Sequence, residues 1–428
     1  GVTAFVTSGI GQLLTSVALS ALSRALAPKP RAAGVRTSAT LAGGTNADAF
    51  VLGWYATEGQ LVCPPMSHGR SGKTPNAYLT YVIEVGGIAG HTLDGLIIDG
   101  EPVTIGATAD PDYGLPILGR FEGRAWIRYH DGTQTAADSM LLDKYADYPE
   151  RPWSAGMVGA GICYAVLTFR YDREVFSGFP KARFVLGGIK LYDPRADSTA
   201  GGSGSQRWGS PATWAPSTNP MVMVYNILRG ITLPGGEIWG GEVVAADLPF
   251  ARWAAAMDDC DELVDGVARY RAGLEVLADD EPYSVIEDLL TACGGQLAEA
   301  GGEWVPAVGA PDLPVLFISD DDVIVTDADD FNPFPSPEQT YNGATATYPK
   351  PASVWEASEI VPIYLPALEA QDGGRRLLAS LSVNACPWAR QVRRVAREAV
   401  LDSRRWRRHS ISLPPDAAPL QPLDTISW

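Results

Sequence analysis

The hydrophobic pattern between residues 33 and 190 is that of β-strands, with apolar positions that alternate or form short runs. These runs are rich in β-branched and aromatic residues, which favour strands over helices. The strands are predicted at 50–56, 78–85, 96–98, 125–129 and 163–169. The dipeptides Asp99-Gly100 and Asp131-Gly132 are typical of hairpin turns. This part of the chain is therefore expected to be strand-rich.

Apolar residues recur at helical spacing in four later segments. The predicted helices are 220–228, 249–264, 282–293 and 386–403. Asn219 followed by Pro220 is typical of a helix start, and Gly294-Gly295 is typical of a helix end. The inward face of the last helix is predicted to hold Val392, Val395, Ala396 and Ala399.

The remaining segments are predicted as loops and short strands. Residues 191–212 form a polar, glycine-rich loop, and residues 350–375 are expected to be irregular. Extended segments are predicted at 296–299, 303–305, 313–325, 340–348, 409–413 and 425–428. No internal repeat occurs at a fixed period, which argues against a solenoid or a propeller.

The first 23 residues carry no charged side chain. Val6, Ile10, Leu13 and Val17 have helical spacing, and Pro28 stops the helix. The segment lacks the basic start of a signal peptide. We expect a helix buried against other subunits; a membrane-active segment is the alternative.

These patterns predict an α+β, β-rich fold with several small β-barrel or sandwich domains, short helices and an N-terminal apolar helix. The expected divisions are 1–32 for the apolar helix, 33–190 for the β-rich part, 191–348 for a mixed α/β domain and 349–428 for a helix with return strands. The first residue is Gly and the last segment reads as a strand, so we expect a processed or excised chain that continues further.

Charge and cysteine usage exclude several function classes. The chain has 33 basic and 50 acidic side chains, a net charge of −17, which disfavours binding to nucleic acid or to an anionic membrane. Five cysteines without CxxC spacing argue against a disulfide scaffold or a structural zinc site, and reduced thiols are expected. The four histidines form no metal-binding pattern.

No enzyme motif is complete in the sequence. Residues 67–74 approach a P-loop, but Ser67 replaces its first glycine and Pro75 prevents the helix that must follow. Neither GxGxxG nor GxSxG is present. The acidic residues Asp320, Asp321, Asp322, Asp327, Asp329 and Asp330 lack the spacing of a calcium loop and are expected on a solvated edge. No catalytic, cofactor-binding or metal-binding residue is therefore assigned.

One basic cluster stands out in this acidic chain. It consists of Arg390, Arg393, Arg394, Arg397, Arg404, Arg405, Arg407 and Arg408, with Trp406 among them. An arginine cluster with an interleaved tryptophan can contact nucleic acid. Pairing with carboxylates of this or a neighbouring subunit is the preferred interpretation, because acidic side chains are in excess.

Three features follow one another in a distinctive order. They are the run Tyr192-Asp193-Pro194-Arg195, a polar loop with tryptophans, and an aliphatic helix that begins at Asn219-Pro220. In this order the chain resembles the central tail-tip proteins of long-tailed bacteriophages, which include host-specificity protein J-like proteins and the hub of gene transfer agents. Weaker similarities at 50–62, 129–134, 286–304 and 413–426 extend the resemblance over most of residues 45–428.

The resemblance implies a structural protein rather than an enzyme, without cofactors: a homotrimeric baseplate hub in the virion that closes the distal end of the tail tube. It implies roles in tail assembly, host attachment and DNA delivery after assembly in the host cytoplasm. Implied partners are the distal tail protein, other tail-tip proteins, the tape-measure protein, tail fibres and a host receptor, with DNA only in transit. Lambda-like relatives carry fibronectin-like modules and a receptor-binding tip that this sequence lacks.

Two further interpretations follow from the resemblance and from the composition. The N-terminal helix is expected on the threefold axis, as a plug that leaves before DNA passes. A carbohydrate-active protein that uses acidic side chains and some of the 12 tryptophans is the alternative function.

Overall fold

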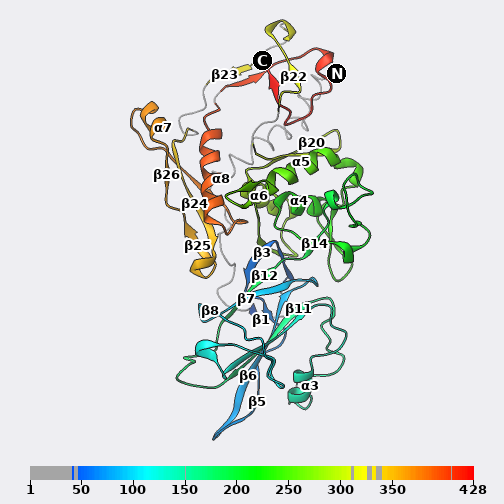
Figure 1. Cartoon of the computed structure of the whole chain (residues 1–428), viewed down its shortest axis with the longest axis vertical. Coiled ribbons are helices and arrows are strands. Elements are labelled where there is room, and N and C mark those ends of the chain that lie inside the picture. The colour runs from blue at the N-terminus through cyan, green and yellow to red at the C-terminus, as the bar shows by residue number, and fades with distance from the viewer. Residues whose placement is uncertain are drawn as a thin grey trace.

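The computed structural model describes residues 41–42, 47–149, 151–309, 313–324, 330–333, 340–405 and 407–428. The molecule is elongated, with its largest sheet at one end and the C-terminus near the other (Figure 1). The fold is mixed and strand-rich, as predicted. The expected N-terminal apolar helix and its plug position lie outside the described residues.

The largest sheet has seven strands, in the order β1-β4-β6-β11-β10-β9, with β5 paired to β6. All pairs are antiparallel except β1 with β4. The strands are β1 (Leu41–Ala42), β4 (Gln60–Leu61), β5 (Met66–Ser71), β6 (Thr74–Gly86), β9 (Leu115–Pro116), β10 (Ala125–Asp131) and β11 (Cys163–Arg170).

A four-stranded sheet packs against the large sheet and completes a sandwich. Its order is β3 (Trp54–Thr57), β12 (Ala182–Gly187), β7 (Thr92–Ile98) and β8 (Glu101–Val103). The two sheets share one core, which includes Tyr55, Ile83, Leu96, Ile127, Leu167 and Phe184. Among the described residues both sheets have open ends, so the predicted small barrels are not confirmed.

The two predicted hairpin turns behave differently. Asp99-Gly100 joins β7 to β8 with positive φ angles at both residues, as predicted. Asp131-Gly132 does not form a hairpin, so this prediction is wrong. The chain leaves β10 there, forms α3 (Ser139–Tyr145), and only then returns as β11 to pair with β10. An aspartate–glycine pair permits a turn but does not fix how soon the partner strand follows.

Gly53 divides the predicted strand 50–56 into two strands that belong to different sheets. β2 (Ala49–Leu52) pairs with β19 (Leu274–Leu277), whereas β3 pairs with β12. Gly53 has a φ of +73°, and a Cβ atom at this position would collide with the carbonyl oxygen of Ala272. A glycine is therefore required where the chain passes from one core to the other.

A second core is built by four helices, three of which follow the sequence predictions closely. They are α4 (Pro220–Arg229), α5 (Phe250–Asp261), α6 (Pro282–Cys293) and α8 (Ala389–Asp402). Helix α5 is shorter than predicted, because the ribbon of β17 (Leu263–Val264) and β18 (Val267–Ala268) follows it. The four residues predicted to face inward from the last helix are buried in this core, together with Met221, Trp253 and Leu289.

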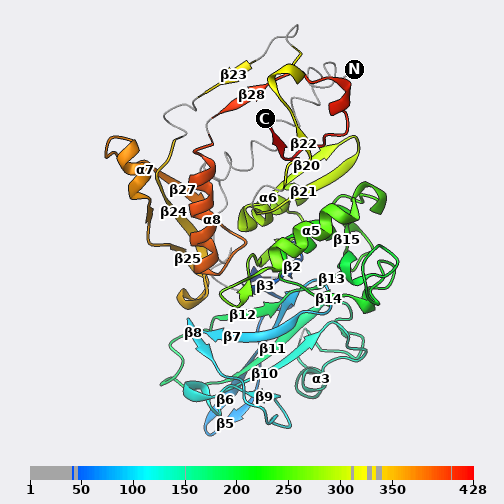
Figure 2. The same cartoon turned by 45° about the horizontal axis from the view of Figure 1, so that its top comes forward.

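A third sheet covers α8, as Figure 2 shows. It contains β24 (Gly343–Lys350), β25 (Glu356–Glu359), β26 (Ile363–Tyr364) and β27 (Leu378–Ser382), and α7 (Pro366–Gln371) follows β26. The prediction that residues 350–375 are irregular is wrong. These short elements have little apolar patterning of their own, and pairing with β24 forms the strands.

The remaining strands form two-stranded ribbons. They are β13 (Lys190–Leu191) with β14 (Ala215–Pro216), β15 (Ile231–Thr232) with β16 (Ile238–Trp239), β20 (Gln296–Ala300) with β21 (Glu303–Ala307), β22 (Leu316–Phe317) with β29 (Ile426–Ser427), and β23 (Asp330–Asn332) with β28 (Arg408–Ser410). The hairpin of β20 and β21 was predicted. Over the described residues 313–324 of the predicted strand 313–325, the strand is reduced to β22. Among the described helices, none combines the length and the apolarity that crossing a membrane requires.

Candidate functional site

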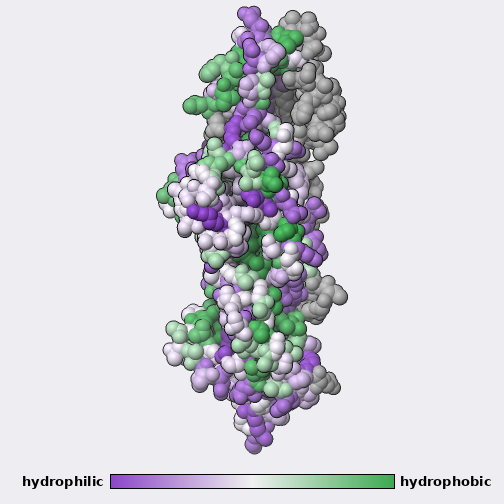
Figure 3. Space-filling view, turned by 90° about the vertical axis from the view of Figure 1, so that its right-hand side faces the viewer, coloured by the Kyte–Doolittle hydropathy of each residue, from purple (hydrophilic) through white to green (hydrophobic). Residues whose placement is uncertain are grey.

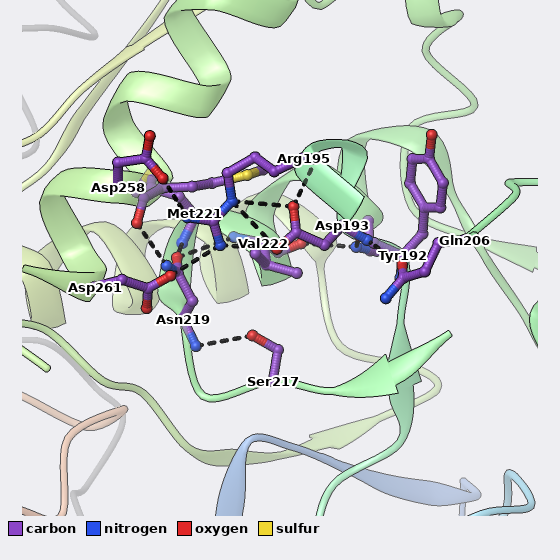
Figure 4. A network of polar contacts seen from close by, with 12 residues as sticks. Tyr192, Asp193, Arg195, Gln206, Ser217, Asn219, Met221, Val222, Asp258 and Asp261 are labelled. Atoms are coloured by element: carbon purple, nitrogen blue, oxygen red, sulfur yellow. Dashed lines mark hydrogen bonds and ion pairs between the residues drawn. The ribbon is translucent and has the colours of Figure 1, made fainter. Parts of the chain in front are cut away.

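The motif Tyr192–Arg195 lies where β13 ends, between the polar loop and helices α4 and α5 (Figure 4). We call this region the tail-motif junction and define it by Tyr192, Asp193, Arg195, Asp197, Gln206, Arg207, Asn219, Asn226, Asp258 and Asp261. The sequence singled out both ends of this junction, and the structure brings them together.

Asn226 of α4 clamps the end of β13. Its side-chain oxygen accepts a hydrogen bond from the Tyr192 N–H at 3.0 Å, and its side-chain nitrogen donates to the Tyr192 carbonyl at 2.7 Å. Asn226 is buried, so these bonds satisfy backbone groups that water cannot reach. The strand end is thereby fixed to the helix.

Asn219 caps α4 and also reaches α5. Its side-chain oxygen accepts from the N–H groups of Met221 at 2.9 Å and Val222 at 3.3 Å, as the sequence predicted for a helix start. Its side-chain nitrogen donates to the Met257 carbonyl of α5 at 2.8 Å. Asn219 therefore sets the position of two helices relative to each other.

Arg195 is surrounded by three carboxylates. Its guanidinium donates to Asp193 at 2.7 Å, to Asp258 at 2.7 Å and to Asp261 at 2.8 Å. Burial by itself would lower the pKa of Arg195, but the hydrogen bonds and charges of these aspartates raise it above its ordinary value. Arg195 is thus a permanent cation that holds α5 against the motif.

Asp197 organises the polar loop. It accepts hydrogen bonds from the Tyr192 hydroxyl at 2.7 Å, from the Thr199 hydroxyl at 2.6 Å and from Arg207 at 2.9 Å. Burial opposes the charge of Asp197, but these donors prevail and lower its pKa to about 2. The predicted loop is therefore a tightly bonded element.

The junction has no arrangement that suits catalysis. Its carboxylates are held by arginines or by hydroxyl and backbone donors, and it contains no histidine or cysteine beside a hydroxyl nucleophile. No group of residues in the described part of the chain has the composition to hold a metal ion. What this geometry achieves is rigid placement of β13, α4 and α5.

A second polar contact, which sequence reasoning missed, joins the sandwich to the third sheet. Arg183 of β12 donates to Glu58 at 2.5 Å and to Glu356 of β25 at 3.1 Å, and also bonds the Val354 carbonyl. Burial raises the pKa of Glu58, while Arg183 opposes that rise. No signal in the sequence could pair residues so far apart.

The arginine cluster is split by the structure. Arg404 binds Asp372 and donates to the Tyr341 carbonyl at 2.6 Å, and Arg405 pairs with Asp402 at 3.1 Å. Arg394 bonds the carbonyl of Arg269. The predicted pairing with carboxylates of this or a neighbouring subunit is confirmed for Arg404 and Arg405, whose partners belong to the same chain, but not for Arg394, which bonds a backbone carbonyl. Arg390, Arg393 and Arg397 are exposed on α8.

The other sequence candidates lie on exposed turns. The P-loop-like segment 67–74 forms the hairpin of β5 and β6, with no helix after it, which excludes a phosphate loop. Asp320–Asp322 form an exposed 3₁₀ turn and Asp330 is exposed, as expected for a solvated edge, whereas Asp327 and Asp329 lie outside the described residues. All five cysteines are free thiols, as predicted, and Cys63 alone among them is not buried.

Two cavities lie apart from the junction. One of about 400 Å³ lies between α6 and α8, where the Tyr270 hydroxyl donates to Glu398 at 3.0 Å. Burial raises the pKa of Glu398. The other, of about 630 Å³, is mostly apolar and is lined by residues that include Met66, Trp153 and Tyr164. In the first cavity the Tyr270 hydroxyl and the Glu398 carboxylate are bonded to each other, and the lining of the second cavity includes no carboxylate or histidine.

The chain matches a family model and solved structures. Residues 281–428 match the model of a family described as putative phage tail protein. The whole fold is similar to a chain of a solved structure described as the virion of a native gene transfer agent particle, with a TM-score of 0.57 and 14% sequence identity. That alignment covers 100% of this chain and 90% of the other. No curated protein matches the sequence.

The matched family segment contains α6, α8 and the third sheet, and the structural similarity extends the likeness to the sandwich and the junction at the level of fold. Together these findings show a phage tail family match over residues 281–428 and a likeness of fold to a chain of a gene transfer agent virion over the whole chain.

Proposed function

We propose that this protein is the hub of a phage-type tail tip, a homotrimer that closes the distal end of the tail tube. In this role it takes part in tail assembly, host attachment and DNA delivery. The observation that carries the proposal is the similarity of fold over the whole chain to a chain of a gene transfer agent virion. The match of residues 281–428 to a phage tail family supports it.

The internal construction of the chain suits such a role. A hub must hold its parts in fixed relative positions while the tube above it is filled and emptied. The tail-motif junction fixes α4 and α5 through Asn219, Asn226 and Arg195. The Arg183 contact fixes the sandwich to the third sheet. These contacts hold the elements rigidly, and their carboxylates are not free for glycoside hydrolysis.

The proposed partners follow from this position. The distal tail protein, other tail-tip proteins, the tape-measure protein and tail fibres would contact the hub, which would meet a host receptor and touch DNA only in transit. A net charge of −17 per chain would keep passing DNA from adhering. Assembly would take place in the host cytoplasm, and the protein would then remain in the virion at the tail tip.

Gold labelling of the chain in assembled particles tests the proposal. A tag inserted at Gly72, on the exposed turn of β5 and β6, leaves the cores untouched. The proposal predicts gold at the distal end of the tail in electron micrographs, and tubes without a closed tip when the gene is deleted. Label spread along the tube or at the capsid would contradict it.

A further inference from the structure

The solvent side of α8 carries a row of arginines. Arg390, Arg393, Arg397 and Leu401 follow one another at intervals of three or four residues, so they lie along one stripe of the helix. All four are exposed, and the opposite side is buried against the second core. We call this stripe the arginine face.

The guanidinium groups of the arginine face lack carboxylate partners within the described part of the chain. Arg393 donates one hydrogen bond to the Val361 carbonyl at 2.9 Å, and no ion pair involves Arg390 or Arg397 there. The nearby Arg404 and Arg405, by contrast, do pair with aspartates of the same chain. Three neighbouring arginines without a carboxylate partner in the described part of the chain are unexpected where acidic side chains outnumber basic ones by 50 to 33.

The surroundings of the arginine face are apolar as well as basic. Leu401 is 46% exposed and Val361, beside Arg393, is 74% exposed. Arginine mixed with exposed apolar side chains is the composition of protein interfaces. A nucleic-acid site would instead favour a continuous basic surface, and the overall charge of the chain opposes it.

The same chain offers a complementary surface in residues 233–247, which we call the acidic loop. It contains Glu237, Glu242 and Asp247 and no basic residue. Ile238 and Val244 of this loop are 42% and 58% exposed. The described residues provide no ion pair for these three carboxylates. The acidic loop is therefore complementary to the arginine face, because both surfaces contain exposed apolar side chains and one carries carboxylates where the other carries guanidinium groups.

The elements that carry the two surfaces lie apart in the molecule. In Figure 2, β15, which leads into the acidic loop, lies on the right, whereas α8 lies on the left. Figure 3 faces the right-hand side, where hydrophobic and hydrophilic residues are interspersed. Complementary patches on different flanks of one chain produce head-to-tail contacts, which close into a ring when the rotation permits.

We propose that the arginine face of one copy binds the acidic loop of the next copy around the hub trimer. The inference rests on the proposed function for the trimer and adds the surface that holds it together. Arginine–carboxylate pairs flanked by apolar side chains would offset the repulsion between three chains of charge −17. The occupant of the arginine face is thus a second copy of this chain.

Charge reversal in the purified full chain tests the inference, with light scattering to measure the mass of the complex. Arg393→Glu with Arg397→Glu should weaken trimer formation at least tenfold. Adding Glu237→Arg and Glu242→Arg to the same chain should restore the trimer. Lys73→Glu with Arg173→Glu makes the same change in net charge at exposed positions elsewhere and should leave the trimer intact. Circular dichroism confirms that every variant is folded.

The outcomes separate the inference from the proposed function. A trimer that survives reversal of the arginine face, or that the acidic-loop reversal does not restore, overturns the inference and leaves the hub proposal standing. If reversal of the arginine face leaves the mass of the complex unchanged but abolishes binding to duplex DNA, the arginine face is a nucleic-acid surface and the inference is overturned. A wild-type chain that is monomeric both in solution and in particles contradicts the hub trimer itself, and the inference with it.

Discussion

The indole ring of Trp355 packs against that of Trp54, with ring centroids 4.7 Å apart. Trp355 follows β24 of the third sheet, yet its side chain is buried in the sandwich core. The centroid of its ring lies 5.1 Å from that of the Tyr55 ring. Val354 and Trp355 both adopt left-handed backbone conformations, with φ of +57° and +65°. Such conformations cost about 1–3 kcal/mol each, so burial of the indole must outweigh them.

Replacing Trp355 with alanine is therefore expected to destabilise the protein strongly. The loss of a buried tryptophan, with strain retained, should lower the free energy of unfolding by about 4 kcal/mol in urea denaturation. Trp428→Ala, at a tryptophan that is 50% exposed, is the matched control and should cost less than about 1 kcal/mol. Equal effects of the two substitutions would show that Trp355 does not join the sandwich to the third sheet.

Gly53 should not tolerate a side chain. Gly53→Ala places a Cβ atom against the Ala272 carbonyl and the Met223 side chain at a φ of +73°, and we expect a loss of more than about 3 kcal/mol. Gly72→Ala has a φ of +58° with nothing within 4 Å, so it isolates the backbone penalty of about 1 kcal/mol. Thermal unfolding of both variants measures the difference. Similar melting temperatures would contradict the close approach.

Buried His91 should make the protein less stable in mild acid. Its Nε2 accepts from the Val51 N–H at 2.9 Å, and burial lowers its pKa from 6.5 to about 4. The unfolded chain binds a proton below pH 6.5, whereas the folded chain does so only near pH 4. Stability is thus lost as the pH falls between these values, by about 3 kcal/mol.

Two measurements check the role of His91. In urea denaturation, His91→Gln should lose less stability than the wild type between pH 6.5 and pH 4. Some loss should remain, because burial also lowers the pKa of His68 to about 4. Titration of the His91 ring by NMR should give a pKa near 4. A value near 6.5 would contradict the assigned environment.

Arg404 and Arg405 should respond differently to charge reversal, although they are neighbours in sequence. Arg404 is nearly buried and binds Asp372, so Arg404→Glu should cost about 3–5 kcal/mol. Arg405 is 67% exposed, so Arg405→Glu should cost less than about 1 kcal/mol. Urea denaturation of the two variants measures both losses in the free energy of unfolding. Equal losses would mean that Arg404 does not hold the segment around Asp372.

The sequence predicted elements well where the local signal and the final packing agree. Asn219-Pro220 at the start of α4 and Gly294 at the end of α6 are local chemical signals, and both helices occur where expected. The glycine at position 53 was included in a continuous strand, because nothing local shows that the two halves enter different sheets. Likewise, β25 and β26 exist only through pairing with β24.

The junction was located by its motif, but its chemistry was not foreseen. Nothing in the sequence indicates that Asp258 and Asp261 meet Arg195, since they lie on a helix far along the chain. The same holds for Arg183 with Glu356. Long-range ion pairs depend on the fold, whereas caps and turns depend on neighbours in sequence.

The most direct test of the central claim is a cryo-electron microscopy reconstruction of the tail tip from intact particles. The account predicts three copies of this fold around the tube axis at the distal end, with the sandwich, junction and third sheet of each recognisable in the density. Finding the chain elsewhere in the particle, or in a number other than three at the tip, would contradict it.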